Sequence, residues 1–227
     1  MKPWLIHLET SGHSCSVALS EANALVEFVW DDSGDHNAVL ALCIKNILMR
    51  NNLHFKDLSA ISVNIGPGSY TALRIGVVMA KTLSHINHLP LVAIMGLDSL
   101  AFMSRLHFPD ASHHLPMIDA RRNDVYVAEY DQFGQLQKDV ELVQLDQIWL
   151  KTWSGREYQL AISGSGSEKW KRTFPESSVR ILDNPLDARM LIPIAWEKYQ
   201  NAEFSNAETL LPFYLKDPNI TVAKKKL

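Results

Sequence analysis

Apolar residues recur along this chain with two different periods, and the order of those periods predicts which segments are strands and which are helices. Alternating or continuous short apolar runs are typical of strands, whereas apolar residues three and four apart are typical of helices. In the first half, the expected strands are residues 4–8, 15–19, 24–30, 58–65 and 91–95. The expected helices are residues 36–49, 70–86 and 96–105. Three strands joined by hairpins, followed by alternating helices and strands, are typical of a ribonuclease H-like α/β lobe.

The second half repeats this order of elements without repeating the residues. A polar segment, residues 107–114, is expected to be a linker with a solvated His113–His114 pair. The strands expected after it are residues 115–119, 125–130, 132–144, 159–163 and 179–182. The helices expected after it are residues 148–153, 167–170 and 186–200, the last with a kink or a late first turn at Pro193. The repeat predicts two lobes, residues 1–106 and a smaller 107–227, whose last helix and tail can pack back on the first lobe.

The most distinctive stretch is Gly66-Pro67-Gly68-Ser69, which separates a predicted buried strand from a predicted helix. Proline fixes its own φ, and the flanking glycines can adopt angles that a Cβ would forbid. Free backbone amides at a helix N-terminus can bind an anion, although most such turns bind nothing. No Walker A lysine follows the glycines. A phosphate loop and a plain turn therefore both remain open.

Three other turns leave the same two interpretations open. The acid and hydroxyls of the first hairpin turn suit a phosphate and its metal, or an ordinary hairpin. Asp119 and Arg121 suit contact with a nucleotide or partner, or a surface ion pair of little energy. Gly164-Ser165-Gly166 suits an adenosine, or a simple strand-to-helix turn. The candidate nucleotide and phosphate residues are Glu9, Thr10, Ser11, Gly66, Pro67, Gly68, Ser69, Asp119, Arg121, Gly164 and Gly166.

The first two long helices carry wide apolar faces. Residues 72, 76 and 80 are small and lie on one stripe, which lets another helix approach closely, within the core or at an interface. His36 opens the first helix, but a helical metal pair needs a second ligand at position 40, which is Leu, so no metal is expected. The candidate partner-interface residues are His36, Val39, Leu40, Cys43, Ile47, Ala72, Leu73, Gly76, Val77 and Ala80.

Composition narrows the class of protein. The 227 residues carry a net charge of −3, so no global basic field favours unaided nucleic-acid binding. The one basic run, Lys224–Lys226, suits a solvated tail. Cys15 and Cys43 form no CxxC motif, which argues against a zinc or disulfide framework. With no signal peptide and no long apolar run, a soluble cytoplasmic protein without membrane contact is expected.

These motifs, taken in order, resemble the TsaB (YeaZ) family. The resemblance rests on residues 5–11, 15–19, 36, 66–76, 118–121 and 125–126, and extends to Gly164–Gly166 and residues 211–215. It implies a two-lobed fold of the actin, Hsp70 and sugar-kinase (ASKHA) class. It also implies a non-catalytic scaffold in tRNA modification, in which a TsaD enzyme transfers a threonylcarbamoyl group to adenosine 37 of tRNAs reading ANN codons (t6A37).

The resemblance further implies partners and an interface. The first two long helices would form the dimer face with a TsaD-like catalytic subunit, or with a second copy when the chain is isolated. A TsaE-like ATPase and the tRNA would join through the complex. The chain would hold no cofactor of its own, with ATP or ADP bound only within the complex.

Two departures from the family pattern bear on the cleft. Glu9 stands where many relatives have Asp, and Ala72 stands where Gly is common. The alternative functions left open are an ATPase or phosphotransferase of the actin-like superfamily and a glycoprotease-like hydrolase. The second would need a metal or nucleophile that the sequence does not supply.

Overall fold

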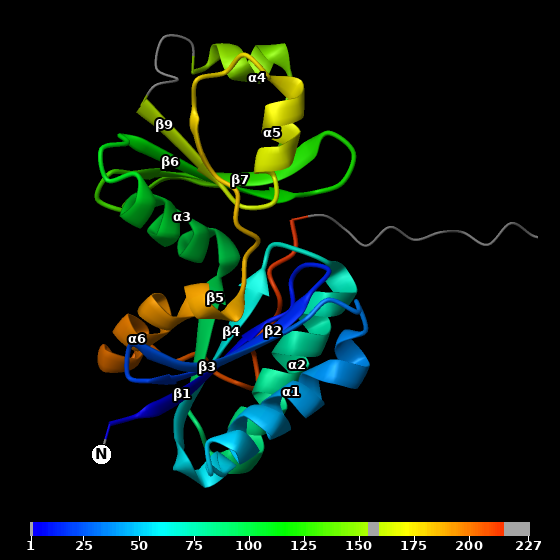
Figure 1. The fold of residues 1–227 in the computed structure, drawn as a ribbon, viewed down its shortest axis with the longest axis vertical. Helices are drawn as coiled ribbons and strands as arrows, with labels where there is room; N and C mark the ends of the chain where they lie inside the picture. The colour runs from blue at the N-terminus through cyan, green and yellow to red at the C-terminus, as the bar shows by residue number, and fades with distance from the viewer. Residues whose placement is uncertain (1, 154–158, 216–227) are drawn as a thin grey trace, which may run out of the picture.

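Two five-stranded sheets organise the chain in the computed structural model, which describes residues 2–153 and 159–215 (Figure 1). The first sheet is formed by β1 (Trp4–Glu9), β2 (Cys15–Glu21), β3 (Ala24–Asp31), β4 (Leu58–Gly66) and β5 (Leu91–Met95). The second is formed by β6 (His113–Asp119), β7 (Asp124–Asp131), β8 (Leu136–Gln144), β9 (Leu160–Ser163) and β10 (Arg180–Leu182). The helices are α1 (His36–Arg50), α2 (Tyr70–Asn87), α3 (Gly96–His107), α4 (Gln147–Lys151), α5 (Ser167–Thr173) and α6 (Ile192–Gln200), with short 3₁₀ turns at Phe55–Asp57 and Ala188–Leu191.

The two sheets share one topology. Their strand orders are β3-β2-β1-β4-β5 and β8-β7-β6-β9-β10. In each, the first three strands form an antiparallel meander and the last two join in parallel. The predicted order of elements and the topological repeat are confirmed, and Pro193 marks a late first turn of α6.

The first sheet is covered on both faces, because its strands alternate two sets of buried apolar residues. Ile6, Leu8 and Val63 pack under α1 and α2. Leu5, Val92 and Ile94 pack on the other face against Leu191 and α6. Figure 1 shows α1 and α2 together on one side of this lobe and α6 on the other.

The second sheet is covered in the same way, with one difference from expectation. Trp170 of α5 and Trp153 pack on one face. The other face packs against Leu97 and Leu100 of α3, which the sequence placed in the first lobe. The apolar stripe of α3 was therefore recognised, but the sheet that it covers was not.

The expectation that His113 and His114 are solvated residues of a linker is wrong. β6 begins at His113, and His114 is fully buried with Nδ1 2.8 Å from the Ser104 hydroxyl. His113 Nδ1 donates to Glu129 Oε1 at 2.9 Å. Both imidazoles are thus held by specific partners in the second lobe.

The segment after α6 returns along the first lobe. Ser205 N donates to Leu91 O at 2.7 Å, and Lys81 Nζ donates to Leu210 O at 2.8 Å. Phe213 N then donates to Ile65 O at 2.7 Å. Residues 205–215, called the C-terminal strap below, therefore run beside α2 and β4 to the glycine loop.

The expected Lys224–Lys226 tail lies outside the described residues. Within the described ranges, no helix is long and apolar enough to cross a membrane.

Candidate functional site

A cleft of about 1120 Å³ is lined by turns from both lobes and by the end of the strap. From the first lobe come the β1–β2 turn and the start of α2. From the second come the β6–β7 turn and Ser165. Of the candidate nucleotide residues, it is lined by Ser11, Pro67, Gly68, Ser69, Asp119 and Arg121.

The glycine loop is packed onto the first hairpin. Ser69 N donates to Ser11 O at 2.7 Å, and a Cβ on Gly68 would lie 2.6 Å from the same oxygen. Gly66 has a φ of +128°, and a Cβ there would lie 2.7 Å from Phe213 O of the strap. Glycine is required at both places because other chain segments occupy the space of a side chain.

Glu9 does not face the cleft. Its side chain is buried, Oε1 accepts from Ser11 N at 2.5 Å, and Oε2 accepts from the Asn64 amide at 2.6 Å. Asn64 Oδ1 in turn accepts from Gly66 N at 2.8 Å. Burial raises the pKa of Glu9 to about 7, and the nearby Asp187 adds to that shift. This carboxyl joins the hairpin turn to the glycine loop and is not among the residues that line the cleft.

Thr10 is also buried beneath the cleft. Its hydroxyl donates to Ala72 O of α2 at 2.8 Å. Gly66 and Ala72 are buried as well, so the residue at position 72 does not present its side chain to a ligand in the cleft.

The β6–β7 turn is fixed by a lysine that the sequence gave no reason to select. Lys169 Nζ of α5 is nearly buried and donates to Asp119 Oδ1 at 2.7 Å and to Asp124 O at 2.8 Å. Asp119 Oδ1 also accepts from the backbone N of Arg121 at 2.6 Å. The ion pair that Asp119 forms is therefore with Lys169, not with the Arg121 guanidinium.

The turn itself has unusual backbone angles. Arg121 and Arg122 have φ values of +69° and +50°, in the left-handed region that non-glycine residues seldom adopt. Both residues are exposed and line the cleft. Arg122 was missed from sequence, since nothing in the string Arg-Arg-Asn-Asp distinguishes it from an ordinary polar turn.

Gly164 and Gly166 serve packing instead of the cleft. A Cβ on Gly164 would lie 2.5 Å from Met117 O, and one on Gly166 would lie 2.6 Å from Met117 Cβ. Only the side chain between them, Ser165, is among the residues that line the cleft, and its hydroxyl accepts from Asp119 N at 3.0 Å. Gly164 and Gly166 themselves are therefore not among the residues that line the cleft.

Comparison with known proteins places the chain in a family. Residues 32–223 match the family model of TsaD, tRNA N6-adenosine threonylcarbamoyltransferase. The tRNA threonylcarbamoyladenosine biosynthesis protein TsaB of Escherichia coli K12 is 28% identical over 240 residues, which cover 98% of this chain and 97% of that protein. The chain belongs to the TsaD family, in its TsaB (YeaZ) branch.

Solved structures bear out the fold. YeaZ from Pseudomonas aeruginosa superposes with a TM-score of 0.79 at 24% identity, covering 94% of this chain and all of that one. The activator of the 2-hydroxyisocaproyl-CoA dehydratase from Clostridium difficile, solved with bound ADPNP, superposes at 0.51 with 9% identity, covering 89% of this chain and 98% of that one. These likenesses confirm the two-lobed ASKHA fold that the family resemblance implied.

The candidate interface residues of this TsaB-branch chain are mostly interior. All of them except Val39 are buried, and they pack in or beside the core beneath α1 and α2. A Cβ on Gly76 would overlap Thr10 Oγ1, so the small stripe allows α2 to approach β1. The assignment of these buried side chains as partner contacts is corrected: the periodicity detected the inner face of each helix.

The outer face of the same two helices carries exposed apolar side chains that sequence reasoning missed. Leu42 and Met49 of α1 are 56% and 63% exposed, and Val78 and Ile86 of α2 are 60% and 67% exposed. Each pair lies seven or eight residues apart, which is two helical turns. We call these four residues the α1–α2 outer face.

His36 is held by backbone. Its Nδ1 and Nε2 lie 3.2 Å from Gly34 O and Ser14 O, and Leu40 is fully buried. Asp35 caps α1, accepting from Ala38 N at 3.2 Å. In the part of the chain that the structure describes, no three His, Cys, Asp or Glu residues are grouped to hold a metal ion.

Proposed function

We propose that this chain is a non-catalytic partner in the formation of t6A37, and that it binds a TsaD-like catalytic subunit through the α1–α2 outer face. The pathway comes from its relatives, since a homologue aligned over nearly its full length is named for threonylcarbamoyladenosine biosynthesis. TsaE-like ATPase and tRNA would join through that complex. An isolated chain would use the same face to pair with a second copy.

The observation that carries the interface is the set of four exposed apolar side chains on adjacent helices. Single exposed apolar residues are common on any surface, but four on one layer of two packed helices can form a contiguous patch. Partly buried Val39, Ile75 and Met79 lie beside the same core and extend the apolar character between the helices. Burial of such a patch by a partner helix stabilises the complex, because apolar surface is removed from water.

The buried position of Glu9 favours a non-catalytic role for the chain. An acid that serves a metal–phosphate complex must present oxygens to it, whereas Glu9 is buried, does not line the cleft, and accepts from Ser11 N and the Asn64 amide inside the lobe. The carboxyl thus stabilises the turn that carries Ser11. We infer that the family's chemistry takes place on the partner.

Substitution of Val78 tests the interface directly. Val78→Glu places a charge within the proposed contact and should weaken co-purification with the TsaD-like subunit by at least tenfold, with loss of t6A from cellular tRNA. Phe133→Glu is the matched control, because Phe133 is 69% exposed in the other lobe. Equal assembly of both variants with wild-type affinity would contradict the proposed face.

The cleft favours a second candidate function, nucleotide binding. It joins both lobes, and the exposed Arg121 and Arg122 could face phosphates. ATP or ADP would then bind within the complex, without hydrolysis by this chain alone. Calorimetry with ATP and magnesium, on the chain and on the complex, separates the cases. Tight binding and turnover by the isolated chain would favour an ATPase over a scaffold.

A further inference from the structure

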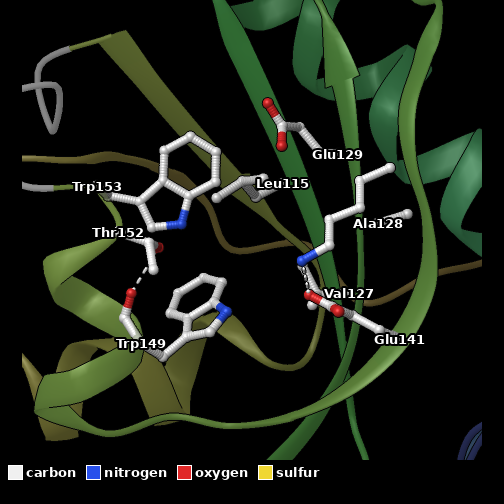
Figure 2. Close-up of a pocket in the computed structure, with 9 residues that line it drawn as sticks. Leu115, Val127, Ala128, Glu129, Glu141, Trp149, Thr152 and Trp153 are labelled. Atoms are coloured by element: carbon white, nitrogen blue, oxygen red, sulfur yellow. Dashed lines mark hydrogen bonds and ion pairs between the residues drawn. The ribbon is translucent and has the colours of Figure 1, made fainter.

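The second lobe contains a separate cavity of about 230 Å³, away from the cleft and from the α1–α2 outer face (Figure 2). Its floor is apolar, formed by Leu115, Val127 and Ala128 of β6 and β7. Figure 2 shows the indole rings of Trp149 and Trp153 on one side and the carboxylates of Glu129 and Glu141 on the other. Neither the family resemblance nor the proposed function makes use of this cavity.

The cavity has the chemistry of a cation site. Indole faces attract ammonium and guanidinium groups, and carboxylates accept their hydrogen bonds. Glu129 engages His113 through Oε1, which leaves acceptor sites on a carboxylate that has about four. Its side chain is only 20% exposed, so a charge placed beside it would be poorly screened.

An internal cation already occupies part of this arrangement. Lys138 lines the cavity, and its Nζ donates to Glu141 Oε1 at 2.7 Å. The Lys138 side chain is 58% exposed, so it can leave Glu141 at little cost in packing. Lys138 and Glu141 form one ion pair at the cavity, and Glu129, which accepts from His113, is the second carboxylate there.

Size restricts the class of ligand. Sites for nucleotides and drug-sized molecules usually occupy about 300–1,000 Å³, which exceeds this cavity. A volume of about 230 Å³ suits one side chain or a small amine.

We propose that this cavity binds a small organic cation, an alkylammonium or guanidinium group, either free or at the end of a basic side chain in a peptide. The aliphatic part of the ligand would lie against the indoles of Trp149 and Trp153, whose ring centroids are 6.3 Å apart, with its charge toward Glu129 and Glu141. Lys138 acts as a resident competitor for Glu141. The site belongs to the second lobe and does not depend on the proposed interface.

Titration of the full chain with n-butylammonium, followed through the indole N–H signals in ¹H–¹⁵N spectra, tests the site. Saturable shifts confined to Trp149 and Trp153 among the six tryptophans are expected, and n-butanol should produce none. The peptide Gly-Lys-Gly distinguishes the two sources: tighter binding than butylammonium indicates a peptide side chain, and equal or weaker binding indicates a free amine. No saturable shift with either probe, or equal shifts with n-butanol, would overturn the proposal.

Three variants make the test specific. Glu129→Gln should weaken binding about tenfold, because it removes a charge-assisted contact. Lys138→Met should tighten binding several-fold, because it frees Glu141, and a purely structural defect would not produce that gain. Asp139→Asn is the matched control, an exposed acid on the same strand that does not line the cavity. Weaker binding in Lys138→Met, or equal loss in Asp139→Asn, would contradict the site.

Discussion

At the scale of single residues, the Glu9 carboxyl points into the protein interior and not into the cleft. The family resemblance leads us to expect aspartate at this position, and the longer Glu side chain accepts from Ser11 N and the Asn64 amide inside the lobe. The sequence shows that Glu9 departs from the family pattern, but it does not show which way the Glu9 side chain points. A side chain's orientation depends on neighbours such as Asn64, 55 residues away in the chain.

The raised pKa of Glu9 predicts a specific pH dependence of stability. Its pKa is about 7 in the folded chain and 4.5 in its ordinary state, so the folded protein binds the proton more tightly. The favourable contribution is complete below pH 4.5 and is lost as pH rises through 7. The loss is of the order of 3 kcal/mol at most.

Denaturant unfolding of wild type and Glu9→Gln across this range checks the sign. The variant pays a constant penalty because its amide faces the Asn64 amide, so the slope against pH is the informative quantity. Between about pH 5 and pH 8, wild type should lose stability relative to Glu9→Gln. A constant difference across that range would mean that Glu9 does not titrate there.

Gly76 predicts a loss of stability that does not depend on any partner. A Cβ at this position overlaps Thr10 Oγ1, whose hydroxyl is already committed to Ala72 O. Gly76→Ala should lower the free energy of unfolding by about 1–3 kcal/mol. Thr82→Ala, on the exposed side of the same helix, should change it by less than about 0.5 kcal/mol. Unfolding of the isolated chain in urea measures both, and equal stabilities would contradict the packing.

At the scale of elements, hydrophobic periodicity predicted the order and type of the segments because each helix and strand has one face in a core. The periodicity could not show which sheet each helix packs against. The stripe of α3 packs on the second sheet, and the inner stripes of α1 and α2 pack on their own lobe. Periodicity reports burial, and burial within the chain and burial by a partner leave the same pattern.

The positions of the turns were predicted from the sequence, but the reasons why particular residues occupy them were predicted less well. Glycines 164 and 166 do mark a strand-to-helix turn, yet they are glycines because Met117 fills the space beside them. The positive φ values of Arg121 and Arg122 had no sequence signal such as Asn-Gly. They are maintained by contacts from α5, 45 or more residues further along the chain.

Lys169 is the contact that maintains this turn, and its removal should loosen it. Lys169→Met leaves Asp119 and the Asp124 carbonyl without their buried donor, and should cost about 1–3 kcal/mol. Faster amide hydrogen exchange should appear at residues 119–124. Lys171→Met, on the exposed side of the same helix, is the control. If both variants exchange alike in this turn, Lys169 does not position it.

At the scale of the whole molecule, the two lobes are copies of one topology used for different purposes. The first presents exposed apolar side chains on its helical layer, and the second contains a small cavity with two indoles and two carboxylates. The cleft is lined by turns of both lobes, while Glu9 beneath it is turned inward. These differences are consistent with a chain that supports a partner's chemistry.

Amide hydrogen exchange of the chain, alone and bound to the proposed TsaD-like partner, tests the proposed interface most directly. Protection on binding should be confined to α1 and α2, with the largest change near Val78, and the turns that line the cleft should change little. Protection centred on the β6–β7 turn or the second lobe, with α1 and α2 unchanged, would contradict it.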